Sequence, residues 1–237
     1  MGNKGKKLTQ PSSRAEVDAF LRKVAATPAV KPAGRRGRLI FAMDATASRE
    51  PTWDRACHIQ GQMFETTASL GGLQIQLCYY RGYGEFKASP WLTRSKELLQ
   101  RMTRVFCLGG LTQIEKVLRH ALKETKDKKV DAVVFVGDVM EEDVDRLAHL
   151  AGELGLHGVP VFLFQEGIDP VAERAFRQIA RLTDGAFCPF DSSSADQLRD
   201  LLSAVAVYAA GGRRALENFG KSRGGVVPRL VHQVKKD

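Results

Sequence analysis

Three oxygen-bearing side chains follow an apolar run near residue 44 of this 237-residue chain. Residues 39–43, Leu-Ile-Phe-Ala-Met, lead into Asp44, and hydroxyls follow at alternate positions, Thr46 and Ser48. A carboxylate at the end of a buried strand can act as a nucleophile or as a metal ligand. In a loop that leaves a strand, positions 46 and 48 point the same way, so both hydroxyls can face one ion.

Two further segments carry matching groups. In one, Gly109 and Gly110 precede Thr112 and a helical pattern; in the other, Asp138 ends a second apolar run. The set contains only oxygen donors, which suit hard cations such as Mg²⁺ and Mn²⁺. An octahedral ion held by so few charged groups keeps open positions, and a carboxylate of a partner protein can fill one of them. The predicted metal ligands are Asp44, Thr46, Ser48, Thr112 and Asp138.

Strand and helix patterns alternate from residue 37 onward. Such alternation, with several strands apolar along their whole length, predicts a doubly wound parallel sheet covered by helices on both faces. Ligands bind such sheets beyond the carboxyl ends of the strands, where the strand order reverses, and Asp44 and Asp138 both end strands. The expected strands are 38–44, 73–82, 84–89, 130–138, 159–167 and 186–191, and the expected helices are 52–70, 95–105, 112–125, 140–155, 171–185 and 194–210.

The order and spacing of Asp44-x-Thr46-x-Ser48, the Gly-Gly-x-Thr112 loop and Asp138 resemble the metal-ion-dependent adhesion site of von Willebrand factor type A domains. The resemblance covers residues 37–210. It implies a three-layer fold with a mostly parallel six-stranded sheet, one antiparallel edge strand at residues 84–89, and helices on both faces. Thr46 replaces the usual serine, and Val139 follows the last aspartate in place of the common glycine; neither change removes a ligand.

An enzymatic alternative starts from the same aspartate. Haloacid-dehalogenase-like phosphatases also open with a strand-terminal aspartate, and Gly137-Asp138 with the acids after it resembles their later motif. In those enzymes a second acid follows the nucleophile by two residues, where this chain has Thr46. General acid catalysis contributes roughly 10²–10⁴-fold, so a phosphohydrolase built on Asp44 would lack much of its rate. Binding is therefore the favoured function.

Charge divides the chain into three parts. Residues 1–38 carry ten Lys or Arg against two acids, residues 211–237 carry seven against two, and the middle carries 19 against 23. We therefore expect a basic N-terminal arm at 1–36 with a short helix, a domain at 37–210, and a basic tail at 211–237. The arms suit nucleic acid or another acidic surface, which is a third candidate function.

The sequence has no apolar run of the roughly 18 residues that span a membrane, and its lysine-rich start lacks the apolar core of a signal peptide. The four cysteines are widely spaced and form no Cys-x-x-Cys pair, which favours a reducing compartment. A cytoplasmic location is therefore expected. The acids that follow Asp138, from Glu141 to Asp145, open a helix and are expected to complement its dipole; the alternative is that they shape the rim of the metal site.

Overall fold

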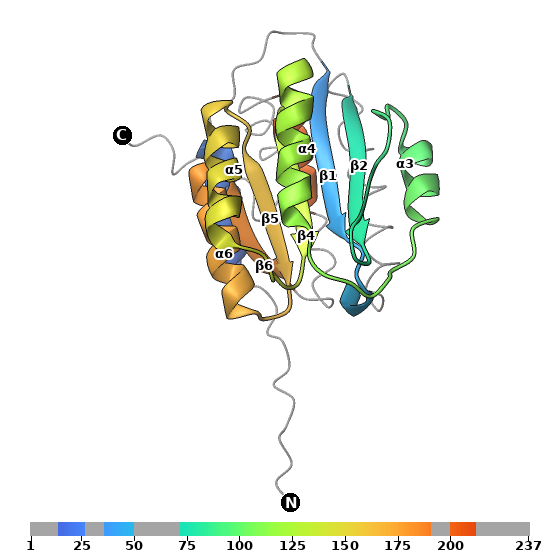
Figure 1. Cartoon of the computed structure of the whole chain (residues 1–237). Helices are drawn as coiled ribbons and strands as arrows, with labels where there is room; N and C mark the ends of the chain where they lie inside the picture. The colour runs from blue at the N-terminus through green and yellow to red at the C-terminus, as the bar shows by residue number, and fades with distance from the viewer. Residues whose placement is uncertain (1–13, 27–35, 50–71, 191–199, 212–237) are drawn as a thin grey trace, which may run out of the picture.

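A six-stranded sheet forms the centre of the molecule in a computed structural model that describes residues 14–26, 36–49, 72–190 and 200–211 (Figure 1). The strand order is β3-β2-β1-β4-β5-β6. Every neighbouring pair is parallel except β2 and β3, which run antiparallel at one edge, as the sequence predicts. The strands are β1 (Gly37–Asp44), β2 (Leu73–Arg81), β3 (Glu85–Ala88), β4 (Ala132–Gly137), β5 (Val161–Glu166) and β6 (Ala186–Phe190).

Helices cover both faces of the sheet (Figure 1). One face carries α4, α5 and α6, and the other carries α1, α3 and the helical residues 200–211. The predicted helix at 52–70 lies outside the described residues, as do the two arms apart from α1. The helices are α1 (Arg14–Ala26), α3 (Ser95–Met102), α4 (Ile114–Asp127), α5 (Val144–Leu156) and α6 (Pro170–Leu182), and a 3₁₀ turn, η1 (Ala47–Arg49), follows β1.

Burial explains why the central strands read as continuous apolar runs. All eight residues of β1 and all six of β4 are buried, because helices pack on both of their sides. Alternate residues of β1 therefore belong to two separate cores: Leu39 and Phe41 face the side of α1, and Ile40 and Ala42 face α4. The three-layer fold expected from the sequence is confirmed.

The short N-terminal helix α1 packs on the sheet. Its apolar stripe contributes Phe20, whose ring lies 5.1 Å from that of Phe164 and 6.2 Å from that of Phe162, both on β5. Val17 and Val24 are buried in the same core. A helix this short is marginal in isolation, so the contact with the sheet is what holds it.

The strand order changes direction at β1, which has β2 on one side and β4 on the other. In doubly wound sheets, ligands bind beyond the carboxyl ends of the strands at the point where the strand order reverses. Asp44 is the last residue of β1, and Asp138 comes directly after β4. The topology thus brings the two acids to the same edge of the sheet.

Candidate metal-binding site

Asp44, the last residue of β1, is completely buried at this edge of the sheet. One carboxylate oxygen accepts the Thr46 N–H at 2.7 Å and the other accepts the Tyr80 hydroxyl at 3.0 Å. Burial raises the pKa of Asp44 and the nearby Asp138 adds to this, while the bonds from Thr46 and Tyr80 oppose it. A carboxylate has about four acceptor positions, so these bonds leave room for a cation.

The two hydroxyls of the first motif lie together. Thr46 Oγ1 and Ser48 Oγ are 3.1 Å apart, because the chain turns into η1, where the Arg49 N–H donates to the Thr46 carbonyl at 3.0 Å. Thr46 is buried and Ser48 is exposed, so the pair runs from the carboxylate toward solvent. Two adjacent hydroxyls beside a carboxylate provide a set of oxygen donors that suits a hard cation.

The segment before Thr112 is bonded to the residue after Asp44. The Leu108 N–H donates to the Ala45 carbonyl at 3.0 Å, and the Gly82 N–H donates to the Leu108 carbonyl at 3.3 Å. Gly110 packs so closely on the turn between β2 and β3 that a Cβ there would lie 2.0 Å from the Gly82 carbonyl oxygen. This close approach explains the glycine that precedes the threonine.

Thr112 is joined to the loop after Asp138. Its N–H donates to the Glu141 carboxylate at 3.3 Å, and its Oγ1 accepts the Glu141 N–H at 3.1 Å. The carboxylate of Glu142 accepts two N–H groups at the start of α4, from Ile114 at 2.6 Å and Glu115 at 2.8 Å. The three predicted segments therefore meet at one rim, and Glu141 and Glu142 hold two of them together.

The acids after Asp138 divide between the two roles that the sequence left open. Within the cluster, Asp143 caps its own helix α5 by accepting the N–H groups of Asp145 and Arg146. Glu141 and Glu142 instead bond to the Thr112 loop and to the start of α4. Burial raises the pKa of Glu142, and its bonds to the α4 backbone oppose the shift.

The sequence reasoning missed three residues at the site: Arg49, Tyr80 and Glu166. Arg49 is 1% exposed, forms an ion pair with Glu166, and is within electrostatic reach of Asp138 and Asp44. Glu166 ends β5 as Asp44 ends β1, so the rule that found Asp44 could have found Glu166 too. Tyr80 gave no comparable signal, because strand aromatics are usually core residues.

These residues fit a divalent cation in both donor type and charge. Asp44, Asp138 and Glu166 bring three negative charges to this edge when ionised, against the single positive charge of Arg49, and Glu141 and Glu142 lie on the same rim. Acids are therefore in excess, a cation would reduce this excess, and the hydroxyls add uncharged oxygen donors. Among the described residues no group of three or more His, Cys, Asp and Glu has the geometry of a metal site, so any ion here depends on Thr46, Ser48 and Thr112.

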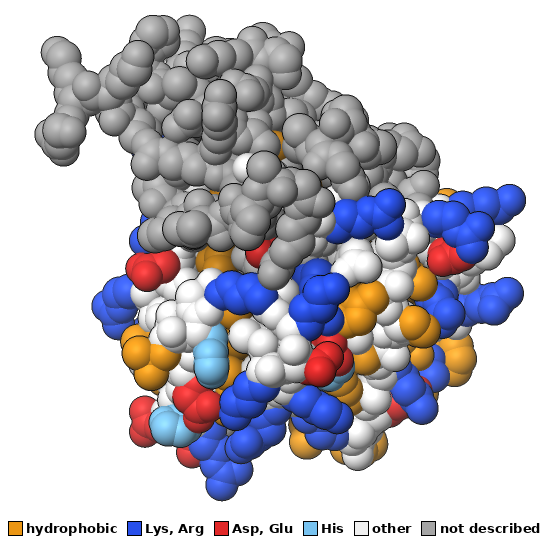
Figure 2. Space-filling model, turned by 90° about the horizontal axis from the view of Figure 1, so that it is seen from above, with side chains coloured by type: hydrophobic (Ala, Val, Ile, Leu, Met, Phe, Trp, Pro, Cys, Tyr) orange, Lys and Arg blue, Asp and Glu red, His pale blue; other side chains and the backbone are white. Residues whose placement is uncertain are grey.

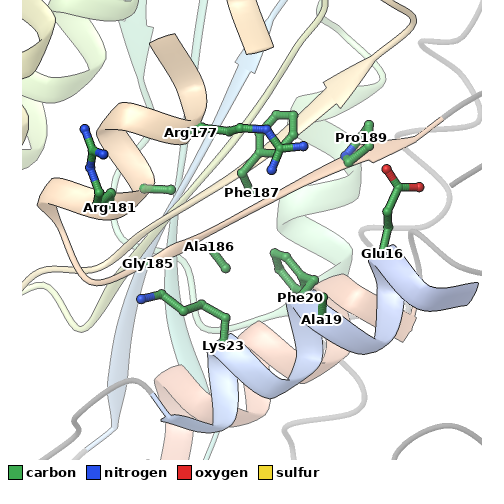
Figure 3. Close-up of a pocket in the computed structure, with 11 residues that line it drawn as sticks. Glu16, Ala19, Phe20, Lys23, Arg177, Arg181, Gly185, Ala186, Phe187 and Pro189 are labelled. Carbon is green, nitrogen blue, oxygen red and sulfur yellow. The ribbon is translucent and has the colours of Figure 1, made fainter. Parts of the chain in front are cut away.

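A separate groove of about 290 Å³ lies at the far edge of the sheet, between α1, α6 and β6 (Figure 3). The Arg177 guanidinium stacks on Phe187 at 4.4 Å, and Phe20, Lys23 and Arg181 line the rest. The groove holds one acid, Glu16, and none of the five predicted ligands. It is therefore distinct from the candidate metal site.

Comparison with known proteins gives matches only at the level of structure. No family model matches the chain, and no curated protein matches it. A von Willebrand factor type A structure from Catenulispora acidiphila superposes with a TM-score of 0.60 at 14% identity, over 72% of this chain and 43% of that one. The VWA domain of SpRpn10 gives 0.55 at 13% identity, over 75% of this chain and 98% of that domain.

Some of the similar structures contain metal. Proximal thread matrix protein 1 from mussel byssus, described with a zinc-occupied MIDAS motif, matches with a TM-score of 0.60 at 14% identity, over 75% of this chain and 47% of that one. The present chain thus spans less than half the length of the Catenulispora and mussel chains. None of the helices described here is long and apolar enough to cross a membrane. The described part of this chain has the fold of a von Willebrand factor type A domain.

Proposed function

We propose that this chain is a metal-dependent protein-interaction module. Asp44, Thr46, Ser48, Thr112 and Asp138 hold Mg²⁺ or Mn²⁺, and the ion binds a carboxylate of a partner protein. The observation that carries the proposal is the adjacent pair of hydroxyls, 3.1 Å apart, which leads from a fully buried carboxylate to the surface beside a second acid. The ion supplies a positive charge that can accept a further oxygen ligand at the exposed end of the site.

Exposed apolar side chains beside the site support a protein partner. Phe106 and Leu111 are 62% and 52% exposed in the segment that leads to Thr112, and Tyr83 is 88% exposed in the turn against which this segment packs. Large apolar groups gathered around a polar site are typical of protein-interaction surfaces. We call Tyr83, Phe106, Leu108 and Leu111 the apolar rim, and we propose that it contacts the partner around the bridging carboxylate.

The enzymatic alternative finds less support. The group at position 46 is a hydroxyl beside Ser48, so a nucleophilic Asp44 would have no neighbouring acid at that position to protonate a leaving group. A structure of the Plasmodium vivax TRAP protein, described as manganese-loaded, has the same fold with a TM-score of 0.54 at 13% identity.

We place the protein in the cytoplasm, since Cys78, Cys107 and Cys188 carry thiols rather than disulfides.

Titration calorimetry with Mg²⁺ and with Mn²⁺ tests the metal site. We expect saturable binding in the wild type, no measurable binding in Asp44→Ala, and at least about tenfold weaker binding in Thr112→Ala, since each change removes a proposed ligand. Asp143→Asn is the matched control, because it changes an exposed acid near the rim that only caps α5. Circular dichroism establishes that each variant is folded.

Loss of binding in Asp143→Asn as well as in Asp44→Ala would indicate a diffuse effect of negative charge and would contradict a defined site. Absence of binding in the wild type at millimolar metal would contradict the metal proposal itself. Binding that Asp44→Ala does not weaken would move the site elsewhere in the chain.

A further inference from the structure

Arg49 occupies an unusual position for a cation, beside acids that are proposed to hold another cation. It follows Ser48 directly, and the η1 turn carries its side chain inward until only 1% of it remains exposed. There it forms an ion pair with Glu166 at the end of β5. The negative charges of Asp138 and Asp44, the two acids of the site, also act on the guanidinium and favour its charged form.

The guanidinium and a metal ion would therefore share the same negative charges. A buried arginine stays charged at all ordinary pH values, so its effect on the site is constant. Two cations held within several ångströms of each other in a poorly solvated region repel strongly. Glu166 counteracts this repulsion, because it holds the guanidinium on the β5 side while Asp44 and Asp138 lie on β1 and after β4.

We propose that Arg49 is a resident cation that limits how tightly the site holds a divalent ion, and that Glu166 is the positioning residue that holds Arg49 aside for the ion. This inference rests on the proposed metal site. In the absence of metal, Arg49 partly neutralises Asp44 and Asp138, which otherwise repel each other without a counterion. On metal binding the guanidinium remains paired with Glu166. The site is thereby adjusted to reversible rather than permanent metal loading.

Variants at the two residues change metal affinity in opposite directions if the proposal is right. Arg49→Met removes the competing charge at similar length, so the Kd for Mn²⁺ and Mg²⁺ falls by about tenfold or more. Glu166→Gln keeps the shape but removes the charge that holds the guanidinium, so the Kd rises by a similar factor. Arg49→Lys keeps a cation at the position and is the matched control, with a Kd within about threefold of the wild type. Calorimetry with each metal ion alone gives the three values.

A role of Arg49 in folding alone gives a different pattern. It would weaken metal binding in Arg49→Met and in Glu166→Gln alike, and this result would overturn the inference. A second measurement covers the case in which Arg49→Met is poorly stable: the rise in melting temperature on adding saturating Mn²⁺ is larger in Arg49→Met than in the wild type, because a ligand stabilises in proportion to its affinity.

The outcomes separate the inference from the function on which it rests. If the wild type binds metal and Arg49→Met binds it with the same Kd, the role of Arg49 is overturned and the metal site stands. Binding that appears only in Arg49→Met would contradict the proposed function of the wild type and the positioning role of Glu166, because the arginine would then take the place of the ion. Absence of binding in all four proteins overturns the metal site and the inference together.

Discussion

The two ends of β1 each carry a buried arginine, Arg38 near its start and Arg49 just past its end, and the two are used differently. Arg38 is 3% exposed and Arg49 is 1% exposed, so neither charge is hydrated by bulk water. The guanidinium of Arg38 pairs with Glu124 at 3.1 Å, donates to the Lys128 carbonyl, and stacks on the Trp91 ring at 3.8 Å. Its partners satisfy it within the fold.

Acids outnumber cations around Arg49. Glu166 forms an ion pair with the Arg49 guanidinium, and the negative charges of Asp138 and Asp44 also act on it. The opposite end of the molecule, where the parallel strands begin, presents many Lys and Arg side chains (Figure 2). Arginine thus has its charge matched within the fold at one end of β1 and lies among an excess of acids at the other. A buried charge is a sign of function where its surroundings are unbalanced, rather than wherever it is buried.

The largest expected effect comes from removing Arg38, whose charge is matched by its partners near the start of β1. Arg38→Met leaves the Glu124 carboxylate without its cation and removes the stack on Trp91, so the free energy of unfolding falls by about 3 kcal/mol. Chemical denaturation measures this loss, and metal affinity stays unchanged because the site lies at the other end of the sheet. Arg119→Ala is the control, since its exposed pair with Glu115 contributes less than about 1 kcal/mol.

A larger stability loss in Arg49→Met than in Arg38→Met would reverse the comparison. It would identify Arg49 as the main structural charge of the domain.

The next effect tests how closely the Thr112 segment is fitted to its neighbours. Gly110→Ala places a methyl group 2.0 Å from the Gly82 carbonyl oxygen, a backbone atom that cannot turn aside, so the loop shifts at a cost of about 1–3 kcal/mol. Its neighbour Gly109 faces open space, and Gly109→Ala is expected to change stability by less than about 0.5 kcal/mol.

Thermal melting of the two variants and their Mn²⁺ affinities complete this test. Only Gly110→Ala should weaken metal binding, because only there does Thr112 move. Equal behaviour of the two variants would show that the approach of Gly110 to Gly82 does not position the site.

The smallest expected effect is a pH dependence of stability that arises at His120, close to the Arg38–Glu124 pair. Burial lowers the pKa of His120 below its ordinary value of 6.5; Glu124 opposes the shift and Lys123 adds to it. The unfolded chain therefore takes up a proton on this residue first as the pH falls. Stability is fully present above pH 6.5 and declines as the pH falls through and below that value, by less than about 1 kcal/mol.

His120→Gln should remove this part of the pH dependence, since an amide does not titrate and can reach the Gln76 side chain, which His120 now contacts at 2.8 Å. His149→Gln is the control, because the His149 side chain is 77% exposed. Denaturation midpoints at pH 7.5 and 5.5 give the comparison. An identical pH slope in wild type and His120→Gln would exclude His120 as the source.

Local pattern was sufficient to predict the fold and to place the proposed metal ligands at one edge of the sheet. A strand buried on both faces must be apolar along its length, so β1 and β4 could be recognised and their terminal acids assigned to one edge of a parallel sheet. The antiparallel edge strand β3 followed from its polar composition and its closeness in sequence to β2. The spacing of Thr46 and Ser48 already implied that their hydroxyls lie together.

Contacts between distant segments were decided only by the tertiary structure. The bonds of Thr112 to Glu141, of Tyr80 to Asp44 and of Arg49 to Glu166 join residues 29, 36 and 117 positions apart, respectively. Periodicity reports which face of an element is buried and not which residue of another element it meets. The sequence by itself therefore determined the set of oxygen donors at the rim, whereas the packing of β1, β2, β4 and β5 placed a cation among them, because charges interact through space rather than along the chain.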